Sequence, residues 1–283
     1  MRAPLIFATL ALSLAACSPT VTPPAGTLAY GLSSSGQLVT FGLENAGSSA
    51  SSKAITGLAS GDTLVDLDFN PNNAALYAFA ASGQVYTLNV STGAATPNTT
   101  PLTALSPFKT DFNPAANRVR VFDTAANTYR LTVTPAPATS PAGTVTADGK
   151  LTYVAGDANA GKTPNLVGAA YTNSYANSGA LPASTALYSV DAGTNTLNMH
   201  STAAGSLPAG NFSTVATVGG LGLTLGSNVG FDIVTSGGTG GTNSAYLVND
   251  RALYSVSLTT GAATQIATLS TGLKALAVTL PTQ

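Results

Sequence analysis

The sequence predicts an all-β protein, and three observations favour a β-propeller of about five four-stranded blades closed by the C-terminal strand. First, residues 64–96 recur 43 positions later without a gap, so that Asp68-Phe69 falls on Asp111-Phe112. Second, the end of this unit, residues 85–96, also aligns with residues 253–264. Third, the expected strands are short and 29 Gly and 16 Pro residues punctuate the chain. Repeats of roughly 40 to 50 residues with this character are typical of propellers.

One unit, residues 64–96, carries the signals of four strands. The residues at 65, 67 and 69 are apolar and alternate with polar ones, which is the period of a half-buried strand. Asn70-Pro71 ends this strand, because proline cannot donate to a sheet ladder. Turn residues Ser82-Gly83 then separate two more alternating runs. We therefore expect strands at 64–70, 75–79 and 84–90, and a short fourth strand after residues 91–93.

The remaining units follow the same plan, with one strand missing and one left over. The first unit (28–31, 37–43 and 53–56) lacks an inner strand, whereas residues 273–280 form an extra strand at the C-terminus. We expect that strand to complete the first unit, because closure removes the exposed sheet edge of an open repeat. The other expected segments are a third blade at 108–146, an inserted hairpin or lid at 148–165, a fourth blade at 167–173, 185–191, 196–201 and 212–218, and a fifth at 229–235, 245–249, 253–258 and 262–269.

The N-terminus predicts export and a lipid anchor. Residues 1–17 combine Arg2, an apolar run and the ending Leu-Ala-Ala-Cys17, which resembles the lipobox of bacterial lipoproteins. The alternative is an ordinary signal peptide with a chance cysteine. Residues 18–26 are a Pro/Thr-rich tether, and residues 27–283 form a single propeller domain. The sequence thus predicts an exported, membrane-anchored lipoprotein of the bacterial cell envelope.

Composition excludes several classes of function. Without Arg2 the chain keeps nine basic residues against 11 acidic ones, so it offers no basic surface for nucleic acid. Cys17 is the only cysteine, which excludes an intramolecular disulfide. His200 is the only histidine, which argues against a multi-histidine zinc site and a Ser-His-Asp triad. We expect His200 on an exposed strand or turn.

Three aspartates form the candidate metal site. Asp68, Asp111 and Asp232 occupy the same place in the expected inner strands of three blades, so a ring would bring them to one level of its channel. Carboxylate oxygens at such a place suit a hard cation such as Ca²⁺. The alternative is that each aspartate accepts backbone N–H bonds at its strand end or turn.

Two further pairs are candidate ligand-binding residues. Arg118 and Arg120 lie on one strand face, where they could pair a carboxylate ligand or a neighbouring aspartate. Asp157 and Asn159 precede a glycine like the opening of a Ca²⁺ loop, but the downstream glutamate is absent and an Asx-turn is the better explanation. Tyrosines 171 and 175 could stack on sugar rings or pack across strands.

Several of these motifs together resemble a known family. The segments DFNPAANRVRVFD (111–123), DGKLTYVAGDANAG (148–161) and AAYTNSYA (169–176) are similar to secreted bacterial domains catalogued as domain of unknown function 4394. The resemblance extends from about residue 28 to about residue 280. It implies a propeller-like fold and an exported protein, and it brings no activity.

The sequence therefore supports one main functional hypothesis and a rival. The main hypothesis is a lipid-anchored envelope propeller without catalytic activity, which presents a binding or scaffold surface to a small ligand, a glycan or an envelope protein. The rival is a metal-dependent (Ca-type) hydrolase or lactonase that uses the channel aspartates to hold a cation and a nucleophilic water. A purely structural envelope component is a third alternative.

Overall fold

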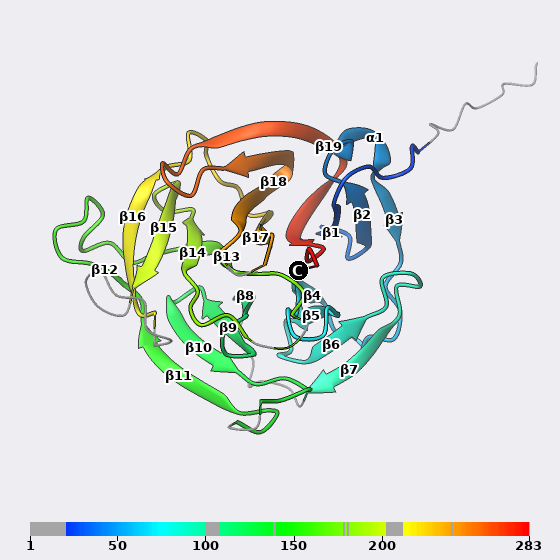
Figure 1. The fold of residues 1–283 in the computed structure, drawn as a ribbon, viewed down its shortest axis with the longest axis horizontal. Coiled ribbons are helices and arrows are strands. Elements are labelled where there is room, and N and C mark those ends of the chain that lie inside the picture. The colour runs from blue at the N-terminus through cyan, green and yellow to red at the C-terminus, as the bar shows by residue number, and fades with distance from the viewer. Residues whose placement is uncertain are drawn as a thin grey trace, which may run out of the picture.

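The structure is a computed structural model that describes residues 21–99, 108–137, 140–177, 179, 181–201, 212–238 and 240–282. Its strands form four sheets set around a common centre (Figure 1). The predicted lipobox cysteine lies outside the described residues. Among the described helices, none is both long and apolar enough to cross a membrane.

Three of the sheets follow the repeat closely. Their strands are antiparallel and run outward from the centre in chain order, apart from a short strand, β12, at the edge of the third. The first contains β4 (Leu64–Phe69), β5 (Leu76–Ala80), β6 (Val85–Leu88) and β7 (Ala95–Thr99); the second β8 (Phe108–Asn113), β9 (Arg118–Asp123), β10 (Asn127–Leu131) and β11 (Val145–Lys150); the third β13 (Leu166–Tyr171), β14 (Leu187–Asp191), β15 (Thr196–Ser201), β16 (Thr214–Gly220) and β12 (Thr152–Tyr153).

The turn after each inner strand explains why the Asp-Phe-Asn-Pro motif recurs. The side-chain oxygen of Asn70 accepts a hydrogen bond from the backbone N–H of Asn72 at 2.9 Å, and Asn113 does the same with Ala115. Each proline follows this asparagine, where the chain leaves the ladder and donates nothing to it. Local chemistry therefore sets the length of both inner strands.

The fourth sheet joins the two ends of the chain. It has six strands in the order β17 (Val229–Ser236), β18 (Thr242–Val256), β19 (Ala263–Val278), β1 (Leu28–Ser33), β2 (Leu38–Gly42) and β3 (Ser51–Lys53), with a short helix, α1 (Ala46–Ser49), between β2 and β3. The first part of β19 pairs with β18, and its last part pairs with β1, from Ser33 opposite Leu273 to Ala29 opposite Val278. The expected closure by the C-terminal strand is thereby confirmed.

The expected number of about five separate blades is wrong, because the structure has four sheets. The sequence predicts separate strands at 245–249 and 253–258, and again at 262–269 and 273–280. Each pair is one extended strand, β18 or β19, and β19 connects the last unit to the first. The six-stranded sheet consequently contributes two strands to the centre. The inner strands follow one another in the order β19, β4, β8, β13 and β17, and β17 returns to β19.

The inserted segment also differs from the expected hairpin or lid. Its start belongs to β11, and β12 then pairs in parallel with β16 through Thr152 opposite Thr214. The insertion therefore covers the outer edge of the third sheet, which is one way in which proteins protect an exposed edge strand.

The end of the expected N-terminal tether contacts the domain. The backbone N–H of Ala25 donates a hydrogen bond to the side chain of Asn45 at 2.9 Å.

Candidate functional site

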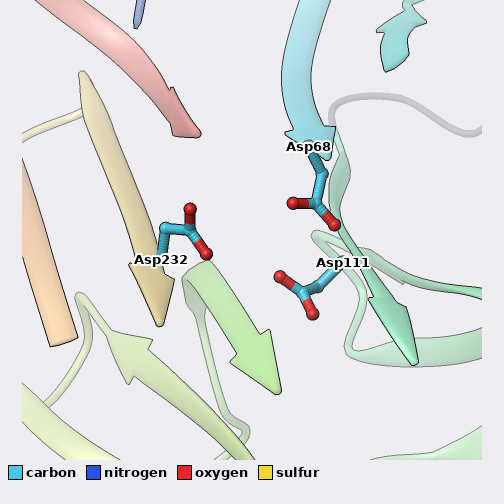
Figure 2. A group of neighbouring side chains, drawn as sticks. All are labelled: Asp68, Asp111 and Asp232. Atoms are coloured by element: carbon cyan, nitrogen blue, oxygen red, sulfur yellow. The ribbon is translucent and has the colours of Figure 1, made fainter. Parts of the chain in front are cut away.

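The three channel aspartates come together at the centre of the ring. Asp68 on β4, Asp111 on β8 and Asp232 on β17 each offer an oxygen, and these oxygens lie within 4.8 Å of one another. Figure 2 shows the three carboxyl groups converging from three separate strands. All three side chains are buried, with at most 6% of each residue exposed. We call these residues the aspartate cluster.

Each member of the cluster also connects two neighbouring inner strands. A carboxylate oxygen on one strand accepts the backbone N–H of the next strand. Asp66, two residues before Asp68 on β4, makes the same kind of bond. The bonds run from Phe112 N to Asp68 at 2.6 Å, from Tyr171 N to Asp111 at 2.9 Å, from Val278 N to Asp232 at 2.6 Å and from Thr110 N to Asp66 at 2.7 Å. The structure thus combines both interpretations of the sequence: the carboxylates cluster, and they bond to backbone. Each of these carboxylates bonds to a neighbouring inner strand rather than to its own turn.

Burial governs the ionisation of the cluster. It raises the pKa of Asp68 and Asp111 well above the ordinary value of 3.8, and the nearby carboxylates raise it further. Burial raises the pKa of Asp232 to about 7. Three charged carboxylates at this spacing repel one another, so protons or a cation must reduce their charge. The three residues fit part of a Ca²⁺ site, which takes six to eight oxygens, and main-chain or water oxygens would have to supply the rest.

A lysine side chain crosses the ring on the side where the inner strands begin. Lys109 on β8 donates from Nζ to the main-chain oxygens of Val229 and Lys274, each at 2.7 Å. Burial lowers the pKa of Lys109, while the charge of Asp66 acts in the opposite direction. The ammonium group of Lys109 therefore joins β8 to β17 and β19. Lys109 is not among the residues predicted from sequence, because both of its acceptors are main-chain atoms more than a hundred positions away.

A backbone segment crosses the ring on the side where the inner strands end. After β13, the chain at Ser174 exchanges hydrogen bonds with Thr235 at the end of β17. The N–H of Ala176 then donates to Pro281 at 2.9 Å, and that of Asn177 donates to Pro71 at 2.8 Å. This segment is residues 173–177, and its first four residues belong to the AAYTNSYA motif. The aspartate cluster is thus enclosed on both sides, by Lys109 and by this segment.

The arginine pair divides into two roles. Arg120 is 1% exposed and forms an ion pair with Asp148 of β11 at 2.5 Å. Asp148 also receives two bonds from Arg130, at 2.6 and 2.7 Å, so it holds two guanidinium groups. Arg118 instead donates to the main-chain oxygen of Arg130 and to the hydroxyl of Thr146, both at 3.0 Å. These contacts fix β9, β10 and β11 to one another.

Asp157 and Asn159 anchor the insertion to the third sheet. Asp157 accepts bonds from the backbone N–H of Thr217 at 2.7 Å and from its hydroxyl at 2.8 Å. It also accepts the N–H of Asn159 at 2.8 Å, which is the geometry of an Asx-turn. Lys162 donates to the side chain of Asn159 at 2.9 Å. The arrangement favours the Asx-turn interpretation over a Ca²⁺ loop.

The expected exposure of His200 is wrong. Its side chain is fully buried on β15, with Nε2 2.8 Å from the hydroxyl of Ser189 and Nδ1 3.1 Å from the main-chain oxygen of Phe212. Burial lowers its pKa to about 3, so the imidazole is neutral at physiological pH. Tyr171 and Tyr175 are buried as well, which leaves neither ring available to stack on a sugar.

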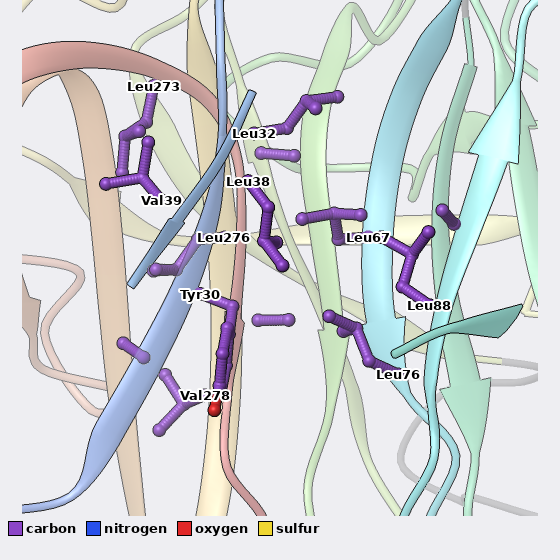
Figure 3. Close-up of a cluster of buried hydrophobic side chains, with 14 of the residues drawn as sticks. Tyr30, Leu32, Leu38, Val39, Leu67, Leu76, Leu88, Leu273, Leu276 and Val278 are labelled. Carbon is purple, nitrogen blue, oxygen red and sulfur yellow. The ribbon is translucent and has the colours of Figure 1, made fainter. Parts of the chain in front are cut away.

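Two adjoining cavities lie outside the ring centre, on the side where the inner strands begin. The larger, of about 530 Å³, is lined by residues 59–63 before β4 and by the β5–β6 turn. The smaller, of about 280 Å³, is lined by the β1–β2 turn, by Leu58, by residues 62–64 and by Lys274. Asp62 and Thr63 line both, so we treat them as one groove. Beneath it, Leu32, Leu38 and Leu276 of the six-stranded sheet pack in one apolar cluster with Leu67 of β4 (Figure 3).

Comparison with known proteins identifies a family. The model of the family described as "Domain of unknown function (DUF4394)" matches residues 37–278. No curated protein matches the chain. A chain in the crystal structure of a nidogen/laminin complex is 13% identical with a TM-score of 0.47, over 91% of this chain and 99% of that one.

Two solved structures from Bacteroides thetaiotaomicron are similar over smaller shares of their own length. An auxiliary nutrient binding protein is 16% identical with a TM-score of 0.40, over 70% of this chain and 49% of that one. A structural genomics protein of unknown function is 13% identical with a TM-score of 0.43, over 84% of this chain and 56% of that one. No conclusion about function follows from likenesses at these identities.

Proposed function

Because the chain belongs to the DUF4394 family of domains of unknown function and folds as a β-propeller, we propose that it is an exported, lipid-anchored envelope protein that binds a ligand without catalysing a reaction. Cys17 would carry the lipid, and the propeller would present its binding surface at a distance from the membrane. The ligand would be a small molecule, a glycan or a segment of an envelope protein.

The place of the ionisable groups supports binding rather than catalysis. A hydrolase that used the aspartate cluster would have to bring a substrate to carboxylates that are at most 6% exposed. The side chain of Lys109 lies on one side of them and residues 173–177 lie on the other. Each carboxylate also holds two inner strands together. These groups serve the closure of the ring, and moving them to admit a substrate would weaken it.

The groove is the observation that carries the proposal. It is built from three loops on one side of the ring, and loops presented by a rigid scaffold are where binding sites are most often found. The larger cavity, of about 530 Å³, is in the range of small-molecule sites, and the adjoining one, of about 280 Å³, extends it. The lining of the groove combines serine hydroxyls, the amide of Gln84, one carboxylate and one ammonium group.

A thermal-shift screen tests this function. The full chain, purified in detergent, is heated with simple sugars, amino acids, short peptides and divalent cations. A groove ligand should raise the melting temperature in proportion to the logarithm of its concentration above its Kd. Ser60→Trp, which places an indole in the larger cavity, should abolish the shift, whereas Ser91→Trp, in the β6–β7 turn outside the groove, should keep it. No shift with any additive, or a shift that Ser60→Trp leaves unchanged, would overturn the proposal.

One observation favours a second candidate, the metal-dependent hydrolase. The three oxygens of the aspartate cluster lie within 4.8 Å of one another, as carboxylate ligands of one cation would. Under this hypothesis CaCl₂ should raise the melting temperature, and Asp68→Asn with Asp111→Asn should remove the effect. Calcium-dependent hydrolysis of lactone or ester substrates, lost in the same variant, would replace the binding function. An unchanged melting temperature in CaCl₂ would remove the basis of this candidate.

A further inference from the structure

The smaller cavity of the groove holds one acidic and one basic side chain that do not pair with each other. Asp62 and Lys274 both line this space of about 280 Å³. Among the residues that the structure describes, both ion pairs involve Asp148, so neither Asp62 nor Lys274 belongs to one. The cavity therefore presents an anion and a cation, each without an opposite charge.

Neutral donors hold the carboxylate of Asp62 in place. Its Oδ2 accepts bonds from the hydroxyls of Ser82 at 2.9 Å and Tyr86 at 3.0 Å, and its Oδ1 accepts the N–H of Thr63 at 3.0 Å. Tyr86 is fully buried, and its oxygen also accepts the N–H of Ala59 at 3.1 Å. These bonds orient Asp62 toward both cavities without neutralising its charge.

Lys274 lines the same cavity from the start of the inner part of β19. Its side chain is partly buried, and burial lowers its pKa, which means that the surroundings disfavour the ammonium charge. The adjacent ammonium of Lys109 bonds to the main-chain oxygen of Lys274 at 2.7 Å, and it faces Asp66. An anionic group placed beside Lys274 would relieve its unfavourable burial.

We propose that the smaller cavity binds a small zwitterion, an amino acid or short peptide, whose ammonium group contacts Asp62 and whose carboxylate contacts Lys274. The inference rests on the proposed binding function and adds the chemical class of the ligand. Charge-assisted hydrogen bonds at both ends would give affinity and orientation together. The small residues of the β1–β2 turn, Ser34 to Gly36, leave room for a short side chain, and the larger cavity can take a second residue.

The lining argues for this class over a neutral sugar. None of the residues that line either cavity is aromatic, so a sugar ring would find no stacking surface there. A neutral ligand would also leave both charges without a partner. A zwitterion satisfies both at once, and a ligand with a single charge satisfies only one.

Isothermal titration calorimetry of the full chain in detergent tests the inference with five probes. These are alanine, the dipeptide Ala-Ala, propionate, ethylamine and glucose. Alanine or Ala-Ala should bind at least about tenfold more tightly than propionate or ethylamine, because each charged contact contributes about one factor of ten. Lys274→Met should weaken zwitterion binding about tenfold and leave ethylamine binding unchanged. Asp62→Asn should also weaken zwitterion binding about tenfold, and it should leave propionate binding unchanged. Lys150→Met, an exposed lysine of β11, is the matched control and should change nothing.

The outcomes separate this inference from the broader function. Equal affinities for the zwitterions and the singly charged probes, or zwitterion binding that Lys274→Met leaves unchanged, would overturn the inference. Glucose binding that Ser60→Trp abolishes, without zwitterion binding, would also overturn it while leaving the groove as a binding site. No binding of any probe, together with no shift in the thermal screen, would overturn both.

Discussion

Replacing Asp232 by asparagine is expected to flatten the dependence of the free energy of unfolding on pH. The carboxyl of Asp232 faces Asp68 and Asp111 in the cluster, and it accepts the N–H of Val278 and of Ile233, each at 2.6 Å. Asp66 lies near enough to raise its pKa further, and Lys109 bonds to the backbone of β17 at Val229. Burial and the neighbouring carboxylates therefore both disfavour the ionised form of this carboxyl.

The magnitude follows from the pKa. Burial raises the pKa of Asp232 from 3.8 to about 7. Because the folded state prefers the protonated form, this contribution is fully present below the unfolded pKa near 4, and it is lost as the pH rises through about 7. A rise of about 3 pKa units corresponds to a loss of about 4 kcal/mol between pH 4 and pH 8.5. Asparagine does not ionise, so the variant should lack this loss, although it carries a constant cost for one displaced N–H bond.

Urea unfolding followed by far-ultraviolet circular dichroism between pH 4.5 and 8.5 measures this difference. The wild-type chain should lose more stability than Asp232→Asn over this range, with the gap opening steadily from pH 4.5 to about pH 7 and changing little above that. Asp123→Asn, at the end of β9 and outside the aspartate cluster, should retain the wild-type loss. Parallel curves for the wild type and Asp232→Asn would refute the reasoning, since they would mean that Asp232 does not ionise against its surroundings.

Three other perturbations test the closure of the fold and its anchor. Asp148→Ala removes the ion pair of the buried Arg120 and should cost about 3 to 5 kcal/mol in urea unfolding; a cost below about 1 kcal/mol would contradict a role in stability. Gly230→Ala places a Cβ 2.4 Å from a backbone nitrogen of β19 and should lower the free energy of unfolding by about 1 to 3 kcal/mol. Gly220→Ala, whose Cβ meets nothing within 4 Å, is the control. Equal melting temperatures of the two variants would count against the tight contact. Cys17→Ala should move the protein out of the membrane fraction, and its retention there would disprove the lipid anchor.

The features that were predicted correctly from sequence depend on local chemistry or on the number of strands in each repeat unit. The Asp-Phe-Asn-Pro motif predicted where inner strands end, because Asn70 and Asn113 bond to backbone only two residues away. The C-terminal closure was predictable because one unit lacked a strand and one strand was left over, and β19 now pairs with β1. The alignment of equivalent positions also predicted that Asp68, Asp111 and Asp232 would lie at one level.

Only the tertiary structure decided the number of sheets. The strand ranges predicted from sequence leave breaks at 250–252 and 270–272, yet both segments lie within extended strands, and Asp250 is paired with Leu273. Whether a chain turns or continues at such a residue depends on the partner strand that is available to it. That partner comes from a distant part of the sequence, so local signals placed a boundary where the sheet continues.

The groups around the ring centre needed the tertiary structure for the same reason. Lys109 reaches main-chain oxygens 120 and 165 positions away, and these acceptors carry no residue-specific signal. The sequence places His200 on an exposed strand or turn, but its two partners become neighbours only when β14 and the segment before β16 pack around it. The sequence by itself determined the repeat, the strand periods and the closing strand, because these depend on spacing along the chain. Burial, ionisation and the groove depend on which sheets face each other, and only the packed ring decides that.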